Sequence, residues 1–125
     1  MERLAWICVA GAAGTGARYL IGVWAAQRFG PTQPFGTLIV NIAGCFMMGA
    51  VMHAALTLSW PGPARSALTI GFLGGLTTYS SFNYETTQLL DAGAYVAAIS
   101  YALATVMGSF VAGLLGMWCM RVLLR

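Results

Sequence analysis

The sequence predicts an all-α integral membrane protein with four transmembrane helices per chain. Hydrophobic residues make up 59% of the 125 positions and only 7% are charged. The mean hydropathy is +0.79. Soluble domains are roughly half apolar and about one-quarter charged, so this chain has more apolar surface than a water-soluble fold of its size can bury. The apolar residues also fall into four long runs with short connections between them.

The first two predicted spans are residues 4–26 and 35–58. Each is long enough, because a helix needs about 20 mainly apolar residues to cross the hydrocarbon core of a bilayer. The first run stops at residues 27–31 (QRFGP) and the second at 59–63 (SWPGP), where glycine and proline favour a turn.

The third and fourth predicted spans are residues 65–90 and 94–120. Residues 91–93 (DAG) separate them, and Arg121 and Arg125 follow the last span. The connections leave no room for a soluble domain. The whole chain is therefore predicted to be one transmembrane domain, with its function inside the bilayer or at its faces.

The arginines indicate how the chain inserts. Four spans place both termini on one side, and that side carries Arg3, Arg65, Arg121 and Arg125 against Arg28 on the other. The positive-inside tendency therefore favours cytoplasmic termini. Since so few charges set this bias, insertion in both orientations is also compatible with the sequence.

Residues 71–82 (GFLGGLTTYSSF) form a poor continuous helix in the middle of the third span. Each of two adjacent glycines costs about 1 kcal/mol relative to alanine, and four hydroxyl side chains compete for backbone groups. We expect a break here, the alternative being a kinked helix. Irregular backbone at membrane depth must be buried in protein or line a cavity, where its carbonyls can coordinate a cation.

Polar side chains recur at helical spacing within three spans. Such groups are costly in lipid and usually face a pathway or a partner. Residues three or four positions apart lie on one helical face, so each span presents one stripe. The stripes are Thr37 and Asn41 in the second span, Tyr79, Phe82 and Glu85 in the third, and Tyr101, Thr105 and Ser109 in the fourth.

Several of these residues have a simpler interpretation. Arg18, inside the first span, can extend its side chain to the interface, and Asn41 can bridge two helices. Glu85 can pair with Arg65 or Arg28 of a partner, and the Tyr79 and Phe82 rings can pack in a core. The glycines inside the spans, including Gly14, Gly16, Gly49 and Gly116, are explained by close helix packing.

Other classes of protein lack support. The six arginines form no basic run, which argues against nucleic-acid binding. Cys8, Cys45 and Cys119 are widely spaced in apolar sequence and are interpreted as packing residues. His53 has no other ligand type near it. No base is paired with a nucleophile and no metal-ligand cluster is present, so the chain is not expected to be an enzyme.

Four stretches together resemble the Fluc (CrcB) family of small fluoride channels over nearly the whole chain. They are residues 16–19 (GARY), 35–44 (FGTLIVNIAG), 71–82 followed by Glu85, and 101–109. The third-span stretch is the strongest match. The family's third-span motif has two phenylalanines three residues apart, whereas this chain has Tyr79 and Phe82. The edge of an aromatic ring is electropositive and can contact an anion, and tyrosine keeps that edge. Its hydroxyl either narrows the path or joins the coordination.

The resemblance implies an antiparallel, dual-topology homodimer in a bacterial inner membrane, with two fluoride pores and a central structural sodium ion. Fluoride would leave the cell passively. Backbone carbonyls of Gly74 and Thr77 from both subunits would hold the sodium, and Arg18 would attract the anion at the vestibule. The pore would be lined by Asn41, Tyr79, Phe82, Tyr101, Thr105, Ser109, Thr37 and Ser81, with Glu85 as a possible further member.

Two other functions compete with a fluoride channel. A small multidrug-type proton-coupled antiporter also has four short helices per chain, but it needs a titratable carboxylate deep in the membrane. After Glu2 the first two spans carry no acidic residue, and Glu85 lies late in the third. A non-transporting accessory subunit would explain the glycines and the small size, but not Arg18 and Asn41 inside the membrane.

Overall fold

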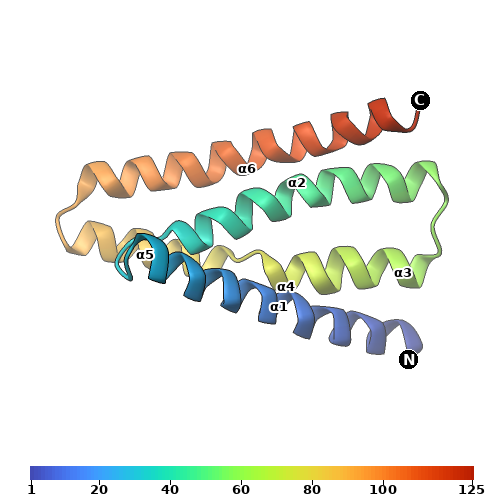
Figure 1. The fold of residues 1–125 in the computed structure, drawn as a ribbon, viewed down its shortest axis with the longest axis horizontal. Helices are drawn as coiled ribbons and strands as arrows, with labels where there is room; N and C mark the ends of the chain where they lie inside the picture. Colours follow the sequence, from blue (N-terminus) through green and yellow to red (C-terminus); the bar gives the residue numbers. More distant parts are fainter.

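The computed structural model describes all 125 residues, and the chain is entirely helical, as the sequence predicts (Figure 1). Three helices are long and apolar enough to cross a membrane: α1, α2 and α6. The predicted third span consists instead of shorter elements in a row. The elements are α1 (Glu2–Phe29), α2 (Phe35–Thr57), α3 (Gly62–Ser66), the π-helix η1 (Ala67–Leu73), α4 (Gly74–Leu76), α5 (Tyr79–Asp91) and α6 (Tyr95–Leu123).

The helix ends follow local turn chemistry. Gly30 caps α1 with φ 99°, and Gly93 lies in the turn before α6 with φ 72°, a left-handed conformation that favours glycine. The first predicted span ends at residue 26, but α1 continues to Phe29. Arg28 marks the edge of the apolar run, whereas the backbone stays helical until glycine ends it.

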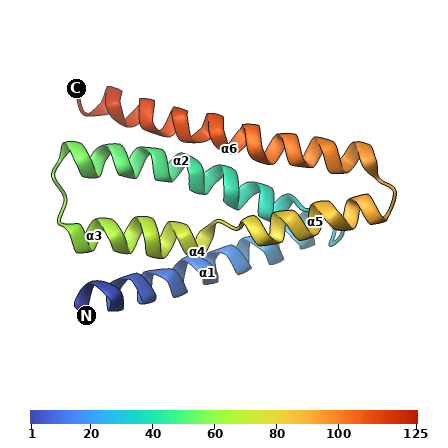
Figure 2. The ribbon, with the colours of Figure 1, turned by 180° about the vertical axis from the view of Figure 1, so that it is seen from behind.

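The helices pack as two close pairs, α1 along η1 and α4, and α2 along α6 (Figures 1 and 2). A Cβ at Gly14 would collide with the carbonyl of Phe72, and one at Gly116 with the carbonyl of Phe46. Glycine therefore lets the backbones touch in both pairs, as expected where lipid supplies no hydrophobic drive. Gly16 is different, because a Cβ there would meet only open space. Packing within one chain therefore explains most of these glycines but not Gly16.

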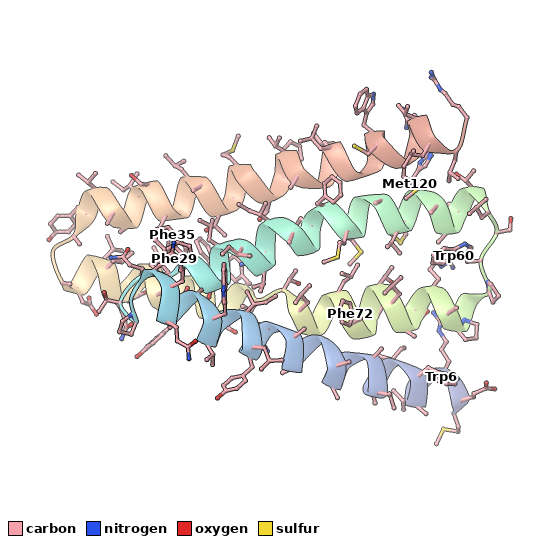
Figure 3. All side chains as sticks on the ribbon, viewed as in Figure 1. Trp6, Phe29, Phe35, Trp60, Phe72 and Met120 are labelled. Carbon is pink, nitrogen blue, oxygen red and sulfur yellow. The ribbon has the colours of Figure 1, made fainter.

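The bundle is elongated, and both termini lie at one end together with the α2–α3 connection (Figure 1). Trp6 and Trp60 lie at this terminal end, while Phe29 and Phe35 lie toward the other end, with ring centroids 5.2 Å apart (Figure 3). The interior is small, and Val40, Leu73 and Leu76 form its fully buried apolar cluster. Most other large apolar side chains are exposed. This arrangement fits a multi-pass protein whose outer surface faces lipid.

Candidate functional site

Helix α4 ends at Leu76 and α5 begins at Tyr79, so two residues between them are not helical. Thr77 has φ −83° and ψ 154°, and Thr78 has φ −150° and ψ 123°, both extended. The N–H and the hydroxyl of Thr77 each donate to the carbonyl of Leu73, at 3.0 Å. The Thr77 carbonyl accepts no hydrogen bond within the chain. Gly44 of α2 makes room for this segment, because a Cβ there would collide with the Thr77 methyl group.

Asn41 joins α2 to the extended segment by two hydrogen bonds. Its Nδ2 donates to the Thr78 carbonyl at 3.0 Å, and its Oδ1 accepts from the Thr78 N–H at 2.8 Å. Asn41 and Thr78 are both buried. Asn41 therefore bridges two elements of the chain, in agreement with its simpler interpretation, and this bridge leaves one of its two N–H groups unused.

Thr78 is absent from the predicted site residues, although it connects several of them. Its hydroxyl accepts from the Ser81 N–H at 3.2 Å, which makes Thr78 the N-cap of α5. A threonine directly before a helix is one of the preferred N-cap residues, so the sequence carries a signal for this cap. This cap fixes the start of the helix that carries Phe82 and Glu85.

A groove of about 240 Å³ opens beside this segment, between α2, α5 and α6. The Thr105 hydroxyl and the Ser109 hydroxyl are buried, and neither has a hydrogen-bond partner. A buried polar group without a partner costs about 1–3 kcal/mol, so both donors favour an acceptor from outside the chain. We call this feature the Asn41 groove, and its walls include Asn41, Thr78, Tyr79, Phe82, Thr105 and Ser109.

Three aromatic rings follow one another, and the first two, Tyr79 and Phe82, line the groove. Tyr79 and Phe82 lie 5.5 Å apart in an edge arrangement, and Phe82 and Tyr101 lie 5.4 Å apart. Phe82 is buried, whereas the Tyr79 side chain is 76% exposed. The ring of Tyr79 thus lies at the open rim of the groove.

Glu85 lies at the centre of a second polar feature, which we call the Glu85 cluster. The Thr37 hydroxyl donates to Oε1 at 2.7 Å, and the Tyr101 hydroxyl donates to Oε2 at 2.6 Å. The cluster thus joins α2, α5 and α6, with both carboxylate oxygens occupied. The pairing of Glu85 with an arginine of a partner chain stays a prediction, because a single chain does not test it.

Arg18 lines a separate hollow of about 280 Å³, together with Thr15, Thr37, Thr78 and Ser81. Thr78 borders both this hollow and the Asn41 groove. Arg18 is half-buried, and Thr78 thus connects its hollow to the groove that holds the unpaired hydroxyls.

The two remaining site candidates do not line the groove. Gly74 is exposed on α4, and Ser81 is half-buried at the start of α5. Cys45 is on the groove wall, while Cys8 is exposed, so packing within the chain does not explain Cys8. His53 lines an apolar hollow with Met48 and Met52, away from the polar stripes.

The chain matches known proteins over nearly its whole length. Residues 5–117 match the family described as CrcB-like protein, Camphor Resistance (CrcB). The chain is 50% identical to the fluoride-specific ion channel FluC of Anaeromyxobacter sp. (strain K), over 90% of each chain. It is 48% identical to FluC of Anaeromyxobacter dehalogenans (strain 2CP-1 / ATCC BAA-258), over 94% of this chain and 98% of that one. With FluC of Sorangium cellulosum (strain So ce56) the identity is 44%, over 99% and 98%.

Proposed function

The chain belongs to the CrcB family, and on that premise we propose that it is a fluoride-specific ion channel through which fluoride leaves the cell passively. The observation that carries this proposal is the Asn41 groove, which holds two buried hydroxyls without acceptors beside the Phe82 ring. Fluoride is a compact anion that accepts hydrogen bonds. Each hydroxyl, together with the electropositive edge of the ring, replaces part of its hydration shell.

The proposed pathway runs from the Arg18 hollow past Thr78 into the groove. Arg18 raises the local anion concentration at the mouth. Inside, Asn41, Thr105 and Ser109 offer neutral donors, which bind the ion weakly enough for it to leave. Thr37 and Tyr101 belong to the Glu85 cluster, which adjoins the groove where the Tyr101 ring contacts Phe82. Their hydroxyls already donate to Glu85, so fluoride has to replace that carboxylate as their acceptor.

The proposed working unit is an antiparallel homodimer with two pores, inserted in both orientations in a bacterial inner membrane. Exposure supports a partner at the extended segment, since Tyr79 and Gly74 both lie open on the single chain. Irregular backbone at membrane depth has to be covered by protein. The single Arg28 at one end and the four arginines of the other give only a small bias against dual insertion.

A structural sodium ion fits the same segment. The Thr77 carbonyl lacks a hydrogen-bond partner, and a carbonyl oxygen is a suitable ligand for a hard cation. We place the ion between the Gly74 and Thr77 carbonyls of both subunits. Its charge would offset the backbone dipoles at the break and hold the two copies together.

Fluoride efflux from liposomes tests the proposed function. The purified full-length chain, reconstituted into vesicles loaded with potassium fluoride, should release fluoride to an ion-selective electrode when valinomycin removes the charge imbalance. Vesicles loaded with potassium chloride should release little chloride. Chloride release as fast as fluoride release, or no fluoride release at all, would contradict the proposal.

A further inference from the structure

The two hydrogen bonds between Asn41 and Thr78 fix the orientation of the Asn41 amide as well as the distance between two elements. One side-chain amide contacts both the N–H and the carbonyl of a single extended residue, at 2.8 and 3.0 Å. This is how a neighbouring strand pairs with a residue in an antiparallel sheet. Both residues are 8% exposed, so water does not compete freely for either bond.

The pairing has only one workable orientation. The Thr78 N–H needs an acceptor and the Thr78 carbonyl needs a donor, and Oδ1 and Nδ2 of Asn41 supply one each. If the amide turned over, N–H would face N–H and oxygen would face oxygen. Both buried bonds would then be lost, and unsatisfied buried groups of this kind are costly.

We infer that the Thr78 backbone is a positioning element that locks the Asn41 amide in one orientation and so keeps one of its N–H groups available as a donor in the groove. The Thr78 N–H occupies one of the two acceptor positions of Oδ1, and the second N–H of Nδ2 has no partner within the chain. A freely rotating amide offers its carbonyl to a cation as readily as its N–H to an anion. In the locked amide a positively polarised N–H already lies against the oxygen while one N–H stays free, which favours a small hydrogen-bond-accepting anion over a cation.

The lock also ties selectivity to the fold of α5. Thr78 caps α5 through its hydroxyl while its backbone holds Asn41. The orientation of the amide and the position of Phe82, one turn into α5, therefore depend on the same residue. This inference rests on the proposed function, because it treats the groove as an anion path.

The side-chain amide signals of asparagine test the lock directly. The chain has two asparagines, Asn41 and Asn83, so selective 15N-asparagine labelling gives two pairs of side-chain N–H signals. Asn83 is exposed and its side chain makes no hydrogen bond, which makes it an internal control. Slow rotation about the amide C–N bond gives every asparagine two separate side-chain proton signals, so the informative quantity is their exchange with water. In bicelles, the Asn41 proton that bonds to the Thr78 carbonyl should exchange much more slowly than its free partner, whereas the two Asn83 protons should exchange at similar rates. Sodium fluoride should shift the free Asn41 proton more than the bonded one, and sodium chloride at equal concentration should shift neither.

Backbone exchange provides the second measurement. In Asn41→Leu the Thr78 amide should exchange with deuterium at least about tenfold faster than in the wild type, a factor equivalent to about 1.4 kcal/mol. Thr105→Val is the matched control, because it removes a groove hydroxyl that does not contact Thr78, and there the exchange should stay unchanged. If Asn41→Leu does not fold, the wild-type amide signals still decide.

The possible outcomes distinguish the proposal of a locked Asn41 amide from the proposal that the chain is a fluoride channel. Equal solvent exchange of the two Asn41 protons in a chain that still conducts fluoride would overturn the lock and leave the channel standing. Unequal exchange of these protons in a chain that releases no fluoride from liposomes would overturn the function and keep the lock. Equal shifts of both Asn41 protons with fluoride would contradict the assignment of one bonded and one free N–H.

Discussion

The Glu85 cluster and the Asn41 groove are built from the same three helices. They differ in whether their polar groups find hydrogen-bond partners within the chain. In the cluster, each carboxylate oxygen of Glu85 receives one hydroxyl, at 2.7 and 2.6 Å. In the groove, Thr105 and Ser109 are buried with no acceptor. The carboxylate in the cluster receives its hydrogen bonds from the chain itself, whereas the two groove hydroxyls need a ligand as acceptor. Polar groups in a membrane helix therefore indicate transport most strongly where they lack partners.

The largest expected effect is that of a negative charge in the groove. Asn41→Asp places a carboxylate where the path needs a donor, and two like charges about 4 Å apart at an effective dielectric near 20 cost about 4 kcal/mol. Fluoride efflux from liposomes should fall by about 100-fold or more. Gln33→Glu, the same exchange of amide for carboxylate in the α1–α2 loop, serves as the control. Equal loss in both variants would mean that overall charge, not position, matters.

A smaller effect separates binding from stability. Ser109→Ala and Thr105→Val each remove a hydroxyl that has no partner in the chain. Fluoride efflux should fall several-fold, while thermal stability in detergent stays equal or rises, since an unsatisfied polar group that cost about 1–3 kcal/mol is gone. Efflux and melting temperature are measured on the same preparations. A drop in thermal stability without a drop in fluoride efflux would mean that these hydroxyls stabilise the fold and do not bind fluoride, which is the opposite of what we expect.

The smallest expected effect lies in the cluster and appears first as stability. Tyr101→Phe removes the hydroxyl that donates to Glu85 and keeps the ring beside Phe82. Hydrogen bonds between membrane helices average about 0.6 kcal/mol, with larger values near 1.7, so the free energy of unfolding should fall by about 1 kcal/mol. Unfolding in SDS–detergent mixtures measures it, with Tyr95→Phe at the exposed start of α6 as the control. Unchanged stability would show that the Glu85 cluster contributes nothing to the fold.

Much of this arrangement can be predicted from the sequence, for identifiable reasons. Helix ends are local, since Gly30 and Gly93 end helices by their own backbone preference. The polar stripes are also predictable, because helical spacing places Thr37 with Asn41 and Tyr101 with Thr105 on one face. The three stripes do meet, as the contacts of Glu85, Phe82 and the groove hydroxyls show.

The partners of these residues are harder to predict, because they depend on tertiary packing. Asn41 bonds to the backbone of a residue 37 positions away, and no side-chain pattern marks a backbone group. Glu85 is held by two hydroxyls from other helices, although an arginine is the more obvious partner for a carboxylate. Gly16 belongs to a run of small residues, but only the fold shows that it faces away from the other helices.

The extended residues Thr77 and Thr78 bear on how ion flow would be controlled. A helix interruption usually suggests a hinge, but here two hydrogen bonds fasten it to α2 and the Thr78 hydroxyl fastens it to α5. These three hydrogen bonds oppose bending between α4 and α5. A passage that opened by bending at this joint would have to break them at each opening, which makes the joint a costly place for a gate.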